Sequence, residues 1–135
     1  MVHRLLVGLV FVVMVTCSTA RADDRSSTGR RHMLVINEDN SHFFSSRKPE
    51  EMTVKGLHEW VDQYAAGAVT HLFLCTNAMR SSFRSTSRDA IWDPVNGKVP
   101  DHRWPRNARR LHEAGIDPYK VWIARCREKK ISPWL

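Results

Sequence analysis

The sequence lacks the short motifs from which many enzymes are identified. It has no CxxC or HExxH spacing to hold a metal ion, no GxSxG turn for a serine nucleophile, and no glycine-rich loop to hold a phosphate. Internal repeats and low-complexity tracts are also absent. We therefore expect neither a metal nor another cofactor, and catalytic residues stay unassigned.

Long hydrophobic runs are confined to the N-terminus. Leu5–Val15 is uncharged, follows a short basic start, and precedes the small residues Ala20–Arg21–Ala22. This pattern predicts a signal peptide over residues 1–22, since the run is too short to span a bilayer, and hence an exported protein with no membrane association after cleavage. An uncleaved anchor and lipid attachment at Cys17 are the alternatives. Residues 23–31 are polar and predict a flexible tether.

Cysteine is scarce, with three in 135 residues, and only Cys75 and Cys126 remain after the predicted cleavage. Two cysteines do not make a disulfide framework, and each lies in an apolar run. Burial as thiols is therefore favoured, although an oxidising compartment also permits pairing.

Acidic residues are fewer than basic ones, and the formal net charge is +7. Loss of Arg4 and Arg21 with the signal peptide lowers it to +5. The basic residues are scattered, which is typical of a solvated surface, and the exported location disfavours nucleic acid. A basic exported domain favours anionic surfaces, glycans or cell-wall polymers.

Apolar runs and helical periodicity predict an α/β fold. Met33–Ile36 and Val69–Cys75 are short, branched apolar runs that suit strands buried on both faces. Thr53–Ala66 has helical spacing of apolar residues and stops at Gly67. The order strand, helix, strand predicts a βαβ unit with two parallel strands.

The second half of the chain is less regular. Residues 78–104 lack a period and predict a long irregular segment, whereas residues 105–114 are helical in pattern. Asp117–Pro118 predicts a helix start that leads to about Lys130. The apolar residues 131–135 then begin a third strand, after which the chain stops, so we expect an incomplete sheet that self-associates through its exposed edges.

The chain resembles the N-terminal part of secreted bacterial glycoside-hydrolase-like (β/α)8 barrels. The segments that carry the resemblance are LVINEDNSHFF, TVKGLHEWVDQYA, VTHLFLCTNAMRSSF, AIWDPVNG, RRLHEAGIDP and KKISPWL. Such a barrel needs about 250 residues. The resemblance implies that residues 32–135 form an incomplete barrel domain with the first two βα units and the start of a third strand, and that the catalytic carboxylates lie on absent strands.

In such barrels the ligand lies at the carboxyl ends of the strands. Polar residues there would hydrogen-bond sugar hydroxyls, and aromatic residues of the long segment would stack on a sugar ring. Each of these residues also has a purely structural interpretation, as a turn-forming residue, a solvated surface charge or a side chain that packs the loop. The predicted substrate-binding residues are Asn37, Asp39, Asn40, His42, Asn77, Arg84, Trp92 and Trp104. Phe43 and Phe44, in a predicted loop over residues 43–49, are further stacking candidates.

Three functions follow from these observations. The first is the N-terminal portion of an exported carbohydrate-active barrel, inactive on its own. The second is a small exported glycan-binding or cell-wall-binding α/β module without catalysis. The third is the product of a truncated or frameshifted gene.

Overall fold

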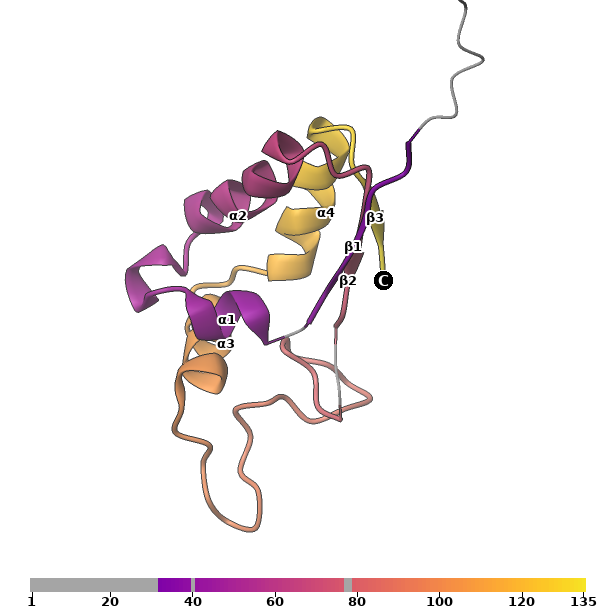
Figure 1. Ribbon diagram of the computed structural model, residues 1–135. Coiled ribbons are helices and arrows are strands. Elements are labelled where there is room, and N and C mark those ends of the chain that lie inside the picture. Colours follow the sequence, from indigo (N-terminus) through magenta and orange to yellow (C-terminus); the bar gives the residue numbers. More distant parts are fainter. Residues whose placement is uncertain (1–31, 40, 77–78) are drawn as a thin grey trace, which may run out of the picture. The chain divides into compact units, whose positions relative to one another are not determined.

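The structure is a computed structural model that describes residues 32–39, 41–76 and 79–135. The predicted signal peptide and tether, at residues 1–22 and 23–31, lie outside the described residues, as do Asn40 and Asn77. Within the described part, three strands and four α-helices form one mixed α/β unit (Figure 1). Their order is β1 (Val35–Glu38), α1 (His42–Ser46), the 3-10 helix η1 (Pro49–Glu51), α2 (Val54–Ala66), β2 (His71–Leu74), α3 (Arg103–Glu113), α4 (Pro118–Glu128) and β3 (Ser132–Trp134).

The three strands form a small parallel sheet in the order β1-β2-β3. Val35 pairs with His71 and Glu38 with Leu74, and Phe73 of β2 pairs with Trp134 of β3. The prediction of parallel, adjacent strands in the first βαβ unit is confirmed. Neither β1 nor β3 has an outer neighbour within the described residues, and self-association through these edges stays a prediction.

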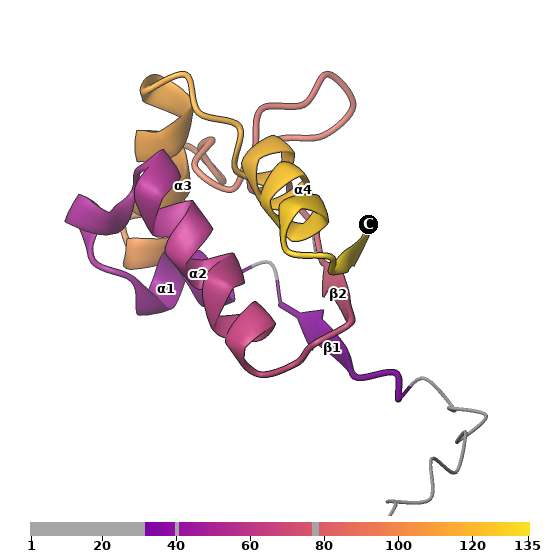
Figure 2. The same ribbon diagram turned by 90° about the horizontal axis from the view of Figure 1, so that it is seen from above.

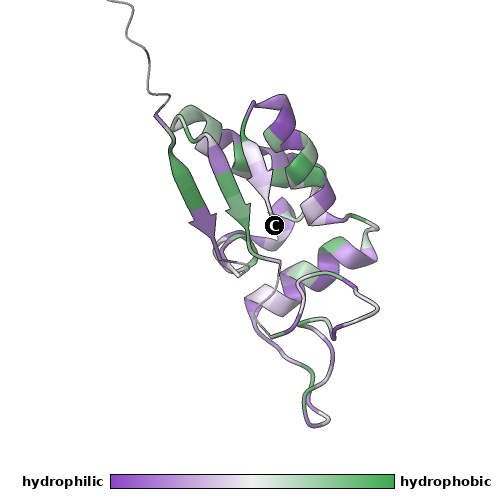
Figure 3. Cartoon of the chain, turned by 90° about the vertical axis from the view of Figure 1, so that its right-hand side faces the viewer, coloured by the Kyte–Doolittle hydropathy of each residue, from purple (hydrophilic) through white to green (hydrophobic). Residues whose placement is uncertain are grey.

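The helices lie together on one side of the sheet, as two perpendicular views show (Figures 1 and 2). Leu72 and Leu74 of β2 face them and are buried, and the neighbouring Phe73 points to the opposite face and is 36% exposed. No helix covers this opposite face in the described part, as the view onto the strands shows (Figure 3). Alternation along the strand thus separates a buried face from an open one.

The core between sheet and helices is rich in aromatic side chains. Trp122 of α4 is its centre, with ring centroids 4.7 Å from Trp60 of α2 and 5.2 Å from both Phe43 and Tyr119. These rings are buried and meet mostly edge to face, an arrangement that stabilises aromatic pairs beyond their burial. Cys126 is also fully buried there, and burial raises the pKa of its thiol to about 11. No disulfide joins Cys75 and Cys126 in the described part.

The predicted helix starts are confirmed, and their caps explain them. The Thr53 side chain accepts a hydrogen bond from the Gly56 amide at 3.1 Å, so α2 begins at Val54. The Asp117 carboxylate accepts from the Lys120 amide at 3.1 Å, with Pro118 in the first turn of α4. Both satisfy an amide that a helix start otherwise leaves unpaired.

Two local predictions are corrected. Residues 43–49 are not a loop, because α1 occupies His42–Ser46 and buries Phe43 and Phe44, which are 1% and 0% exposed. These two rings belong to the core and are not available to a sugar. Trp104 lies inside α3, which begins at Arg103, and not in the irregular segment.

The irregular segment between β2 and α3 is confirmed, and it is an integral part of the core. Among its described residues, the β-pairing is limited to two isolated bridges, Ser81 with Ala90 and Val95 with Lys98. Ala90, Ile91 and Trp92 are nevertheless buried, at 0%, 7% and 5% exposure.

The described residues contain no helix that is both long and apolar enough to cross a membrane.

Candidate functional site

A buried carboxylate stands at the carboxyl end of β1. Glu38 is 9% exposed, and its two oxygens are bonded to the Tyr64 hydroxyl and, at 2.6 Å, to His42 Nδ1. Burial and the neighbouring Glu38 raise the pKa of Tyr64, so the phenol keeps its proton and donates a hydrogen bond to the carboxylate. Because Glu38 occupies Nδ1, the half-exposed His42 has only Nε2 left for a ligand.

Asp39, the next residue, is arranged differently. It is exposed, and one of its oxygens accepts from both the amide and the hydroxyl of Ser41, each at 2.6 Å. These bonds hold the pKa of Asp39 below its usual range. Its carboxylate therefore stabilises the turn before α1, while Glu38 is turned into the protein. The two acids do not face each other across a common space.

Asn37 lies on the open face of the sheet. It is exposed and pairs in register with Phe73 of β2. It therefore belongs with Phe73 and Trp134 and not with Glu38 and His42, whose side chains lie on the helix side. Asn40 and Asn77, the other two predicted amides, lie outside the described residues.

Arg84 and Trp92 form a connected cluster in the irregular segment. The Arg84 guanidinium binds both oxygens of Asp93, at 2.7 and 3.0 Å, and lies over the Trp92 ring at 5.3 Å from its centroid. This ion pair holds the pKa of Asp93 below its usual range. Trp92 also stacks on His112 of α3 at 5.4 Å. Trp92 thus attaches the segment to α3, and only a small part of its ring is open to a ligand.

Trp104 is half-buried at the start of α3. Its Nε1 donates to the Ser82 hydroxyl at 3.2 Å, and its ring stacks with His102 at 6.3 Å. It also lines a shallow, mainly apolar pocket with Ile91 and Val95. Of the predicted aromatic pair, Trp104 therefore has the greater access to solvent.

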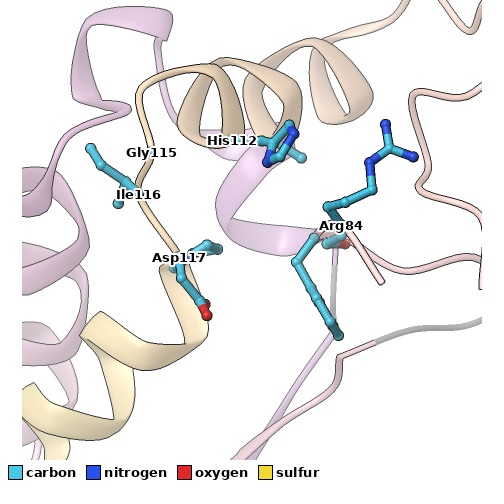
Figure 4. Close-up of a pocket in the computed structure, with 9 residues that line it drawn as sticks. Arg84, His112, Gly115, Ile116 and Asp117 are labelled. Atoms are coloured by element: carbon cyan, nitrogen blue, oxygen red, sulfur yellow. The ribbon is translucent and has the colours of Figure 1, made fainter. Parts of the chain in front are cut away.

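Two pockets lie near the irregular segment and the carboxyl end of the sheet. Both include Phe83 and Asp117 in their linings, and we call the two hollows together the Phe83–Asp117 groove. In one hollow, Arg84 and His112 lie on one side and Asp117, at the start of α4, on the other (Figure 4). The second hollow is lined by Thr76 and Leu135, which follow β2 and β3, and by Tyr119, Lys120 and Ile123.

The groove combines an aromatic ring with both hydrogen-bond donors and hydrogen-bond acceptors. Phe83 is half-buried and packs edge to face against Tyr119 at 5.5 Å, which leaves part of its ring at the groove. The Asp117 carboxylate accepts hydrogen bonds, and the Arg84 and Lys120 side chains donate them. Of the predicted substrate-binding residues that the structure describes, only Arg84 lines this groove.

The remaining lining residues have weak sequence signals. Asp117 is visible in the sequence as a helix cap, and Gly115 as the end of the preceding helix, but neither pattern indicates a ligand. His112 is visible only as a side chain on a helix. The fold brings all three beside Phe83 and Arg84 of the irregular segment, which are about 30 residues earlier in the chain.

Neither protein-family models nor curated proteins match the chain. Among the described residues, His, Cys, Asp and Glu side chains do not gather in groups of three that could hold a metal ion.

Proposed function

We propose that this chain supplies the first βα units of a glycoside-hydrolase-like β/α barrel in an exported protein, and that the Phe83–Asp117 groove is part of its carbohydrate site. The observation that carries the proposal is the one-sided sheet. The parallel strands follow chain order, every α-helix in the described part lies on one face, and the other face exposes Phe73 and Trp134. Doubly wound sheets carry helices on both faces, whereas barrel strands turn one face inward.

The position of the groove supports a carbohydrate ligand. β/α barrels bind substrates at the carboxyl ends of their strands, and Thr76 and Leu135 come at those ends of β2 and β3. A sugar presents hydroxyl groups around a ring with apolar faces. Phe83 would contact such a face, and Asp117 and His112 would hydrogen-bond the hydroxyls.

Hydrolysis by this chain alone is not part of the proposal. Glycoside hydrolysis uses two carboxyl groups that face each other across the sugar, roughly 5 to 10 Å apart. Of the described acids near the carboxyl ends, Glu38 is buried between His42 and Tyr64, the Asp39 carboxylate accepts from Ser41 in the turn before α1, and Asp117 caps α4. We therefore expect binding without turnover.

An NMR titration with oligosaccharides tests the proposal. We expect saturable shifts at Phe83 and Asp117, and Phe83→Ala should weaken binding about tenfold, the equivalent of one lost ring contact. Arg109→Ala is the control, because Arg109 lies on the exposed side of α3 and its ion-pair partner among the described residues is Glu113. Absence of saturable shifts across neutral, amino and acidic saccharides would refute the carbohydrate site.

The second candidate function is a glycan-binding module, and one specific observation favours it. Phe73 and Trp134 lie side by side on the open sheet face, with ring centroids 5.1 Å apart, and Trp134 is 50% exposed. Adjacent exposed rings on a sheet suit a flat polysaccharide surface. Retention of the chain on insoluble polysaccharide, abolished by Trp134→Ala and unaffected by Phe83→Ala, would favour the module over the groove.

A further inference from the structure

Two tryptophan and two tyrosine rings form a continuous row through the core. Tyr64 and Trp60 of α2 have ring centroids 5.0 Å apart, and Trp60 is 4.7 Å from Trp122 of α4. Tyr119, at the other end of the row, is 5.2 Å from Trp122. Indole and phenol rings lose one electron more readily than phenylalanine or histidine rings, and rings in contact exchange an electron rapidly. An electron deficiency created on one of these rings can therefore move along the row.

The two tyrosines differ in the partner of the hydroxyl group. The Tyr64 hydroxyl donates to one oxygen of the Glu38 carboxylate, and the other oxygen is bonded to His42 Nδ1 at 2.6 Å. Burial raises the pKa of Tyr64, so its phenol is protonated and releases a proton when it loses an electron. Glu38 is a base in direct contact with that proton. The Tyr119 hydroxyl donates at 3.1 Å to the Cys75 carbonyl, a backbone group that is too weakly basic to take up a proton.

The two tryptophans between these ends lack a base. Trp60 and Trp122 are 2% and 3% exposed, and their Nε1 atoms make no hydrogen bond within the described part of the chain. An indole that loses an electron becomes a radical cation, which is stabilised when its N–H proton passes to a base. Without a base the charge stays on a buried ring, where it is unfavourable. The indole radical cation therefore remains a strong oxidant of the neighbouring ring.

We propose that Trp122, Trp60 and Tyr64 form a path for one-electron oxidation that ends in a neutral tyrosyl radical at Tyr64. The oxidant is an oxygen-derived radical of the carbonate radical anion type. It takes one electron from Trp122 and leaves as carbonate. It reaches Trp122 through Tyr119, whose ring contacts Trp122 and lines one hollow of the groove.

The later steps move one electron and one proton. The Trp122 radical cation takes an electron from Trp60, and the Trp60 radical cation takes one from Tyr64. In this last step the Tyr64 hydroxyl proton passes to Glu38, which becomes a neutral carboxylic acid. The positive charge of the indole and the negative charge of the carboxylate are thereby both removed from the core. The path does not depend on the proposed carbohydrate ligand.

Pulse radiolysis of the full chain in bicarbonate buffer, which generates the carbonate radical anion, tests the path. Transient absorption and electron paramagnetic resonance distinguish indole radicals from phenoxyl radicals. We expect a phenoxyl signal that rises as part of the indole signal decays. The phenoxyl signal is the readout, because Trp134 is 50% exposed and is also oxidised. The chain has only two tyrosines, so Tyr64→Phe should abolish this signal, whereas Tyr119→Phe, which keeps the ring contact, should leave it unchanged.

Variants of the path and of the base separate the two parts of the proposal. Trp60→Phe interrupts the path and should abolish the phenoxyl signal. Trp92→Phe is the matched control, because Trp92 is also buried, at 5% exposure, but stacks on His112 outside the row. Glu38→Gln keeps the size of the side chain, removes the base, and should also abolish the signal.

Circular dichroism establishes that each variant is folded before irradiation, and Trp122→Phe interrupts the path one ring earlier if Trp60→Phe does not fold. Absence of a phenoxyl signal in the parent chain, or its survival in the folded Trp60→Phe or Trp122→Phe variant, would overturn the path. Loss of the signal in Tyr119→Phe would overturn Tyr64 as its end. Survival of the signal in Glu38→Gln would overturn the proton transfer.

Discussion

Asn107 of α3 determines whether α1 is held in place, and its replacement gives the sharpest stability prediction. The residue is 1% exposed, and its side-chain amide donates to the Phe44 carbonyl at 2.8 Å and the Arg47 carbonyl at 3.0 Å. These carbonyls lie at the end of α1, where the helix itself supplies no further donor. Asn107→Leu keeps the branched shape of the side chain, although leucine is larger, and removes both donors.

The magnitude follows from the surroundings of the two carbonyls. The bond to Phe44 is buried, so water does not replace it and the loss costs about 1–3 kcal/mol. The bond to Arg47 is half-buried and its loss costs about 1 kcal/mol, because water partly replaces the donor. We expect Asn107→Leu to lower the free energy of unfolding by about 2–4 kcal/mol in total.

Urea unfolding followed by tryptophan fluorescence measures this change. Arg109→Ala on the exposed side of the same helix should cost less than about 1 kcal/mol, because its ion pair with Glu113 is solvated. Asn107→Leu should also broaden the NMR signals of His42 and Phe44, which lie on the helix that loses its support. A loss below about 1 kcal/mol with unchanged α1 signals would refute this account of Asn107.

Three further predictions use the same unfolding assay. Gly56→Ala should destabilise the chain although alanine favours helices, because its Cβ would lie 2.0 Å from the Glu51 carbonyl oxygen, and a stability gain would contradict this close approach. Thr53→Ala should cost about 1 kcal/mol through loss of the α2 cap, whereas Thr53→Ser should restore most of it. Hydrogen bonds from Arg125 lower the pKa of Asp62, so this pair stabilises the fold above the unfolded pKa of Asp62 and ceases to do so as the pH falls through the lower folded pKa. Asp62→Asn should therefore reduce the free energy of unfolding at neutral pH by less than about 1 kcal/mol, because Asp62 is about a third exposed. The difference between the variant and the parent should vanish in acid. A difference that persisted in acid would exclude the ion pair as its cause.

The parts of the fold that depend on neighbours in the sequence were predictable. Short branched runs predicted the first two strands, and apolar spacing with Thr53 predicted α2. The expectation that both faces of these strands are buried was wrong, because Val35 and Phe73 are 39% and 36% exposed. Asp117 and Pro118 located the start of α4 to the residue, because a cap and a proline act within one turn. The parallel pairing followed from the length of the connection between β1 and β2.

Features that depend on distant parts of the chain were not predictable. α1 has only five residues, too few to show a helical period, and it is held by Asn107 from more than 60 residues later. Trp92 was expected to be available to a sugar, yet it packs between Arg84 and His112 of α3. The groove likewise combines Phe83 with Asp117, which only the folded chain brings together.

The irregular segment between β2 and α3 also bears on how this sequence can diverge. Residues 86–89 and 94–99 are exposed, whereas residues 90–92 are buried between them. Substitutions and insertions should therefore accumulate in the two exposed stretches, while positions 90–92 remain restricted in size and polarity. Related sequences would then share an apolar triplet at positions 90–92, which would anchor their alignment through this segment. The length of the segment would say little about whether two sequences are related.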